Sequence, residues 1–143
     1  MGGGSRRGGP RAVKVLLDTH VLLYWLDGGT RLTRAQRKAV GSASEGEPLW
    51  VSDISLWEIA TLVSLRRIRL RLPLRDWLEA AVAPPLVRRV SISPTVASEV
   101  AGLPESFHRD PADRIIVASA RATGATLLTQ DRRIIDAGIV DTL

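Results

Sequence analysis

Short apolar runs alternate along the chain with longer segments that open on helix-start signals. We expect buried strands at 12–17, 49–51, 86–92 and 125–128, with 138–140 as a possible fifth. Helix-start signals precede three of the expected helices: Ser52 or Asp53 as an N-cap, and Ser93-Pro94 and Asp110-Pro111 as caps with proline at the first helical position. The helices expected from these patterns lie at 18–26, 33–44, 53–67, 73–82, from 94 onward, and 111–124.

This alternation of strands and helices is typical of an α/β fold. It predicts a three-layer α/β/α sandwich around a mostly parallel central sheet. We find no internal repeat and no linker, and 143 residues fit one domain. We therefore expect one domain over 12–143, preceded by a disordered Gly/Arg-rich tail or cloning remnant at 1–11.

Charge and composition restrict the chemistry. The formal charge is +5 and the pI is about 10.9, which favours a polyanionic partner without requiring one. There is no cysteine and there are only two histidines, which excludes thiol chemistry and a Cys/His zinc site. The longest apolar region, 13–26, contains Lys14, Asp18 and His20 and is too short to span a bilayer. We expect a soluble cytoplasmic protein with no membrane partner.

Two aspartates follow predicted strands. Asp18 ends the first strand, and Asp131 comes shortly after the fourth. Ligands of open α/β sheets bind outside the carboxyl ends of the strands, so both residues are candidates for a site at that edge. The alternative for Asp18 is a helix N-cap, and for Asp131 a turn.

Two further acids lie on apolar helices. Glu58 is the only charged residue between 54 and 65, in a helix that is apolar almost all round and is expected to be buried. A buried carboxylate needs a cation, a proton or an ion pair with an arginine. Asp113 stands three residues after the expected cap Asp110. It either faces the edge of the sheet as a site residue, or only interacts favourably with the dipole at the helix N-terminus.

Four carboxylates that share a small space require a cation or raised pKa values. Their hard oxygen atoms select Mg²⁺, or Mn²⁺ as a substitute. Such a site suits phosphodiester hydrolysis, because the metal activates water and stabilises charge on the phosphate. We take all four acids as catalytic, with Asp18 and Asp113 as the metal ligands and Glu58 and Asp131 as possible further ligands.

Four short motifs in order resemble the PIN-domain nucleases, and among them the VapC-type toxins of bacterial toxin–antitoxin pairs. The motifs are LDTHVLL at 17–23, ISLWEIA at 54–60, HRDPADR at 108–114 and LTQD at 128–131. The resemblance implies a Mg²⁺-dependent endoribonuclease with Asp18, Glu58 and Asp113 as core acids and Asp131 as the fourth. It also implies a homodimer and an antitoxin that blocks the groove.

The match has two departures and one added feature. Ala112 stands where an aromatic residue is common, and Asp53 stands where a small or apolar residue is common. We expect Asp53 to be a helix N-cap rather than an additional ligand. Thr129 matches a hydroxyl that often lies near the site, although it also fits a turn cap.

Other residues have weaker signals. His20 is either a general base or, as we expect, a hydrogen-bonded structural histidine. The tryptophans at 25, 50, 57 and 77 are expected in the core. Arg67, Arg69 and Arg71 alternate with apolar residues, which places them on one face of an extended stretch. They are candidates for contact with RNA phosphates or an acidic antitoxin, or are simply solvated.

Other functions fit less well. An aspartate-nucleophile phosphatase needs a second acid two residues after the first, where His20 stands, and a receiver domain needs a late lysine, whereas none follows Lys38. A catalytically weak RNA-binding module of the same fold is disfavoured by the presence of all four acids. Nothing in the sequence distinguishes RNA from DNA as the substrate.

Overall fold

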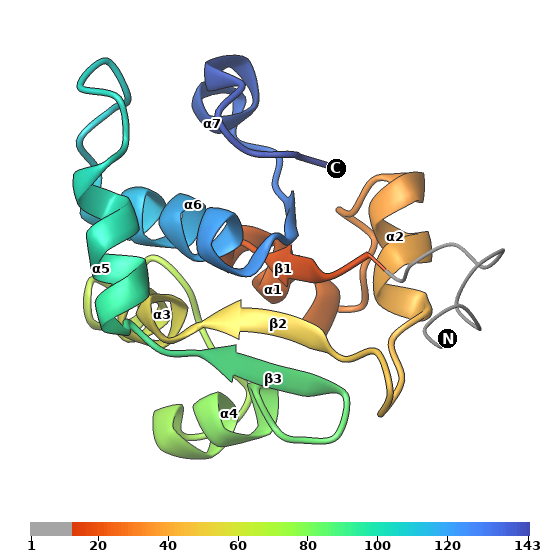
Figure 1. Cartoon of the computed structure of the whole chain (residues 1–143). Coiled ribbons are helices and arrows are strands. Elements are labelled where there is room, and N and C mark those ends of the chain that lie inside the picture. Colours follow the sequence, from red (N-terminus) through yellow and green to blue (C-terminus); the bar gives the residue numbers. More distant parts are fainter. Residues whose placement is uncertain (1–12) are drawn as a thin grey trace, which may run out of the picture.

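The computed structural model describes residues 13–143. Its centre is a four-stranded sheet in the order β3-β2-β1-β4, with every pair parallel (Figure 1). The strands are short: β1 (Val15–Leu17), β2 (Leu49–Ser52), β3 (Val87–Val90) and β4 (Thr126–Leu128). In register, Leu16 of β1 lies between Trp50 and Leu127.

The two faces of the sheet bury different side chains. Leu16 and Leu127 belong to one apolar cluster, and their neighbours Leu17 and Leu128 belong to the other, because successive residues of a strand point to opposite faces. The first cluster is covered by α5 (Pro94–Ala101), α6 (Pro111–Thr123) and α7 (Arg132–Ala137). The second is covered by α1 (Thr19–Leu26), α2 (Arg34–Gly41), α3 (Asp53–Ser64) and α4 (Leu74–Ala81). The predicted three-layer α/β/α architecture is therefore confirmed.

Most helices begin where the sequence signals place them. Ser52 caps α3, Ser93 caps α5 with proline at its start, and Thr33 forms a capping box with Gln36 in α2. The buried Gln36 side chain also donates to the carbonyls of Thr129 and Leu143, at 3.1 and 2.9 Å. It thereby ties α2 to the segment that follows β4 and to the C-terminus.

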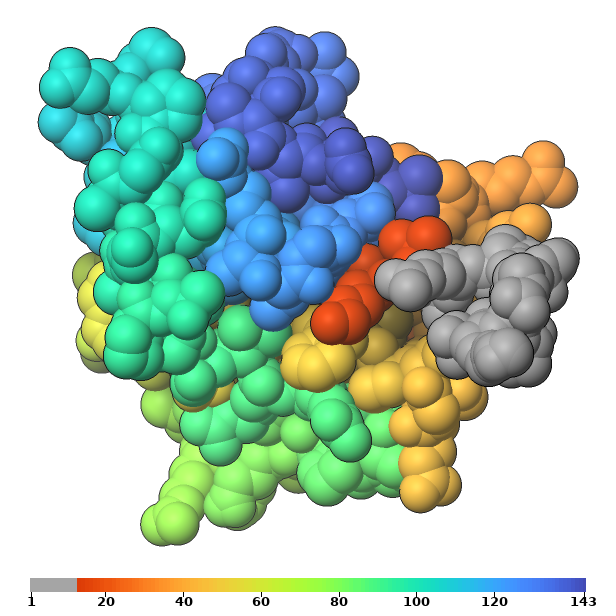
Figure 2. Space-filling view, in the orientation of Figure 1, coloured from red at the N-terminus to blue at the C-terminus, as the bar shows by residue number. Residues whose placement is uncertain are grey.

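The C-terminal region differs from the prediction. Residues 138–140 form no strand, and within 13–143 the only pairing there is an isolated bridge between Leu127 and Thr142. Instead the chain forms the short helix α7, which the sequence analysis missed. In the space-filling view the C-terminal residues lie against α6 and β1 (Figure 2).

The helix α3 is not buried all round, which corrects our expectation. It ends at Ser64 and buries only Ser55 and Ile59, while the Trp57 side chain is 57% exposed. The other tryptophans are half-buried in apolar contacts, so the core assignment is wrong for Trp57 alone. The physical reason is that α3 contacts α1, α4, α6 and β2, and these neighbours leave Trp57 exposed.

The expected tail at 1–11 lies outside the described residues. Within 13–143, no helix has both the length and the apolar character needed to cross a bilayer.

Candidate active site

The site forms at the carboxyl ends of the two adjacent central strands. Asp18 directly follows β1, and Asp131 comes three residues after the end of β4. The buried Thr129 joins them: its hydroxyl donates to the Asp18 carboxylate and accepts from the Asp131 backbone N–H, with 3.0 Å between N and Oγ1. Parallel pairing of β1 with β4 therefore fixes the separation of two acids that are far apart in sequence.

Helices supply the other two predicted acids. Glu58 comes from the middle of α3 and Asp113 from the first turn of α6. All four predicted acids, together with Asp110, line one open cavity of about 620 Å³. The cavity places them in the neighbourhood that their spacing in the sequence indicated, although they do not form a single tight cluster.

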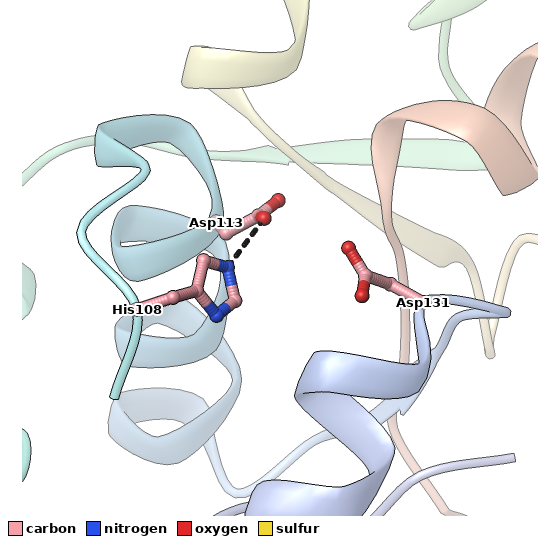
Figure 3. A group of neighbouring side chains, drawn as sticks. All are labelled: His108, Asp113 and Asp131. Atoms are coloured by element: carbon pink, nitrogen blue, oxygen red, sulfur yellow. Dashed lines mark hydrogen bonds and ion pairs between the residues drawn. The ribbon is translucent and has the colours of Figure 1, made fainter. Parts of the chain in front are cut away.

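The tightest group that could hold a cation consists of His108, Asp113 and Asp131. One ligand atom from each lies within 4.8 Å of the others, and the three side chains point toward a common space (Figure 3). His108 Nε2 lies 2.7 Å from Asp113 Oδ2. Asp18 and Glu58 line the same cavity but are outside this group.

His108 is a site residue that the sequence analysis did not identify. It stands in the loop before α6, and Arg114 holds that loop by donating to the carbonyls of Phe107 and His108 at 3.2 and 3.3 Å. The available signal was its place five residues before Asp113, within the motif at 108–114. Only the folded loop turns its ring back onto the helix.

Arg133 was also missed. Its guanidinium lies 3.2 Å from Asp131 Oδ2 and 3.4 Å from Asp113 Oδ2, so it bridges two of the acids. The side chain comes from the start of α7, a helix that the sequence pattern did not predict. Without that helix its direction could not be inferred.

The acids differ in their electrostatic environment. Burial raises the pKa of Asp18, and hydrogen bonds from Thr129 and the Val21 amide only partly oppose it. Burial also raises the pKa of Glu58 and Asp113, with further increases from neighbouring carboxylates. For Asp131, burial alone would raise the pKa, but hydrogen bonds from Arg133 lower it below the usual value.

This donor set fits a divalent metal ion. Asp18 is buried and Glu58 and Asp113 are half-buried, without enough positive charge nearby to stabilise their ionised forms, and a bound cation would supply it. Carboxylate oxygens suit Mg²⁺ and Mn²⁺, and the imidazole of His108 is better matched to Mn²⁺. The chain therefore offers ligands for a hard divalent ion.

Three other predictions have clear outcomes. Asp110 caps α6 as expected, accepting from the Asp113 amide at 3.0 Å. Asp53 is not the cap of α3, because Ser52 takes that role; Asp53 instead accepts two hydrogen bonds from Arg89, at 2.7 and 3.1 Å. His20 is exposed and makes no side-chain hydrogen bond within 13–143, so the structural assignment is wrong; its ring faces the acidic cavity.

A second cavity of about 630 Å³ adjoins the acidic one. It is lined by Arg67, Arg69 and Arg71, which are exposed, while the intervening Ile68 and Leu70 pack on the core. This stretch therefore has the alternation expected from the sequence, with its three guanidinium groups on the solvent side.

Comparisons with known proteins agree with this geometry. The family model for the PIN domain matches residues 15–140. The chain is 42% identical over 120 residues to Ribonuclease VapC22 of Mycobacterium tuberculosis, covering 84% of this chain and 88% of that protein.

Solved structures of low sequence identity share the fold. VapBC2 from Rickettsia felis, bound to a DNA fragment from its promoter, has a TM-score of 0.67 at 13% identity and covers 90% of this chain and 96% of its own. VapC20 of Mycobacterium tuberculosis, a Sarcin-Ricin loop cleaving toxin, has a TM-score of 0.63 at 17% identity and covers 90% and 98%. With the acidic cavity at the sheet edge, these similarities show that the chain belongs to the PIN-domain family and is a relative of the VapC ribonucleases.

Proposed function

We propose that this protein is a Mg²⁺-dependent endoribonuclease and the toxin of a toxin–antitoxin pair. The observation that carries the proposal is the gathering of Asp18, Glu58, Asp113 and Asp131 from four separate elements around one cavity. The raised pKa values of three of them favour a site completed by a cation. The similarity to Ribonuclease VapC22 supports RNA as the substrate.

Each residue has a distinct part in this proposal. Asp18 and Asp113 hold the metal ion, with Glu58 and Asp131 as possible further ligands and Mn²⁺ as a substitute ion. When bound, the ion supplies an activated water and stabilises charge on the phosphate. Thr129 fixes the Asp18 carboxylate, and His108 orients Asp113 through its 2.7 Å contact.

The arginines beside the acids bind the substrate backbone. Arg67, Arg69 and Arg71 line the cavity that adjoins the acidic one, where they can neutralise the phosphates on either side of the cleaved bond. The net charge of +5 favours such a polyanion. We propose that the same face is covered by a cognate antitoxin in the inhibited state, since structural relatives are toxin–antitoxin complexes.

Two further proposals concern the state of the protein in the cell. We propose a homodimer, because the exposed Trp57 on α3 is an apolar surface that a second copy would cover. We also propose a cytoplasmic location, which is consistent with the absence of a bilayer-spanning helix within 13–143.

A cleavage assay on matched single strands tests the activity. Labelled RNA and DNA of the same sequence are incubated with the protein in Mg²⁺ and in EDTA. We expect cleavage of RNA in Mg²⁺ alone. Cleavage of DNA instead would favour a DNA nuclease, and binding of RNA without cleavage would favour a catalytically weak RNA-binding module.

A further inference from the structure

We propose that the second cavity is a nucleotide subsite in which Tyr24 and Arg31 stack on an unpaired base beside the cleaved phosphate. The proposal rests on the proposed RNA-cleaving function and specifies how the RNA strand is held. It assigns a role to Tyr24, the only tyrosine of the chain.

The second cavity is continuous with the acidic one. His20, Tyr24, Arg67 and Ile68 line both, so a strand whose phosphate reaches the acids has its next nucleotide over these residues. The volume of about 630 Å³ lies within the range of sites that hold small organic ligands. The space is therefore large enough for a base with its ribose.

Tyr24 has the surroundings of a stacking platform. The ring is half-buried in α1, and the Arg31 guanidinium carbon lies 5.5 Å from its centroid. The His20 ring lies 6.2 Å away at an interplanar angle of 55°. Unpaired RNA bases stack on tyrosine rings and on guanidinium planes, and this pair offers both surfaces.

The polar groups of the pair are free to contact a ligand. Among residues 13–143, neither the Tyr24 hydroxyl nor the Arg31 side chain is hydrogen-bonded or ion-paired. Since no buried side-chain donor or acceptor in the described chain lacks a partner, the hydroxyl is open to solvent. It can therefore reach the edge of a base or a ribose hydroxyl.

The charge around the cavity matches a nucleotide strand. Four arginines line it and Asp27 is its single acid. Because Ile68 and Leu70 pack into the core, Arg67, Arg69 and Arg71 are held on the same side as the Tyr24 ring. Proteins hold single-stranded nucleic acid by this combination: guanidinium groups contact the phosphates, and a neighbouring aromatic ring stacks on the bases.

The test separates base stacking from backbone attraction. Binding of the full chain is measured by fluorescence anisotropy in EDTA at low salt, with a labelled strand of ten adenosines and a matched strand of ten abasic ribose phosphates. We expect wild type to bind the adenosine strand about tenfold more tightly than the abasic strand. Tyr24→Leu should lose about this factor on adenosines and nothing on the abasic strand.

Matched variants guard against a folding defect. Tyr24→Phe keeps the ring and should keep most of the preference for bases. Arg31→Gln changes an exposed residue and should lower that preference without altering the melting curve. Arg75→Gln, on α4 and outside both cavities, should bind both strands as wild type does.

Two results would overturn the proposal. If Tyr24→Leu weakens both strands equally, the ring only shapes the groove. If Tyr24→Leu changes the affinity for neither strand, the cavity does not bind bases and is instead a candidate contact for a protein partner such as an antitoxin. Failure of the proposed function would be seen separately. If wild type prefers the adenosine strand but cleaves no RNA in Mg²⁺, the subsite is supported and the nuclease function is contradicted.

Discussion

Two capping aspartates in the acidic cavity, Asp18 and Asp131, each use both carboxylate oxygen atoms. Asp18 Oδ1 accepts from the Val21 amide at 2.8 Å, and Oδ2 accepts from the Thr129 hydroxyl. Asp131 Oδ1 accepts from the Arg133 amide at 2.9 Å, and Oδ2 accepts from the Arg133 guanidinium at 3.2 Å. Both aspartates therefore cap a helix while they line the cavity, and their part in metal binding stays a prediction.

Asp113→Asn should stabilise the metal-free protein at neutral pH. Burial raises the folded-state pKa of Asp113 above its unfolded value, so its contribution to stability is complete below the unfolded pKa and is lost as pH rises through the folded pKa. Removing the charge should raise Tm in EDTA at pH 7 by about 2–5 °C, and by less near pH 4. Thermal melts at both pH values check this.

Asp110→Asn is the matched control for that experiment. Asp110 is exposed and caps α6, and asparagine caps as well as aspartate does, so Tm should hardly change. A lower Tm for Asp113→Asn than for wild type at pH 7 in EDTA would contradict the electrostatic account of the cavity.

Arg133→Gln should strengthen metal binding. The guanidinium bridges Asp113 and Asp131 at 3.4 and 3.2 Å, where it competes with a divalent cation. Because the arginine is exposed, the effect is modest: the Mn²⁺ dissociation constant should fall by about twofold to fivefold. Isothermal titration with Mn²⁺ measures it, and Arg132→Gln, whose partner Asp136 is outside the cavity, should change nothing. Equal or weaker affinity in Arg133→Gln would exclude the competition.

At the scale of elements, the order of strands and helices could be predicted because apolar runs and caps are local signals. The strand ends also placed Asp18 and Asp131 at one edge of the sheet. His108 and Arg133 could not be placed, since their directions depend on an irregular loop and on the six-residue helix α7. The exposure of Trp57 was missed because an apolar helix face looks the same in sequence whether a domain or a partner covers it.

Gly124 controls the passage from α6 into β4. It takes a left-handed conformation, φ +70°, at the end of the helix, and a Cβ built there meets nothing within 4 Å. Gly124→Ala should therefore destabilise the fold by about 1 kcal/mol through backbone strain alone. Gly41 ends α2 with the same open space but without a positive φ, so Gly41→Ala should be neutral or stabilising. Urea denaturation measures the free energy of unfolding of both variants. Equal effects would contradict the attribution of the Gly124→Ala cost to backbone strain.

At the scale of the molecule, the exposed side of α3 is the surface we propose for a second copy. Trp57 is 57% exposed and Leu65 at the end of the helix is also 57% exposed. Isolated apolar residues on a surface are ordinary, but a tryptophan of this exposure is a common anchor at interfaces. We therefore propose this face for the dimer contact.

Trp57→Glu should convert the proposed dimer to a monomer of 15.5 kDa, because the charge would be buried in the contact. Light scattering at micromolar concentration measures the mass of wild type and variant. Leu72→Glu, at an exposed position outside α3 in the chain, is the control and should leave the mass unchanged. A monomeric wild type would refute the dimer, and a dimeric Trp57→Glu would move the contact elsewhere.

The central claim is that the acids at the sheet edge cleave RNA with a divalent ion. The measurement that tests it most directly is the RNA cleavage rate of wild type, Asp113→Asn and Asp110→Asn in Mg²⁺, with an EDTA control for wild type. We predict cleavage by wild type in Mg²⁺ only, near-normal rates for Asp110→Asn, and a loss of about 100-fold or more for Asp113→Asn, because a neutral amide cannot balance the charge of the cation. Normal turnover by Asp113→Asn, or an active wild type in EDTA, would contradict the account.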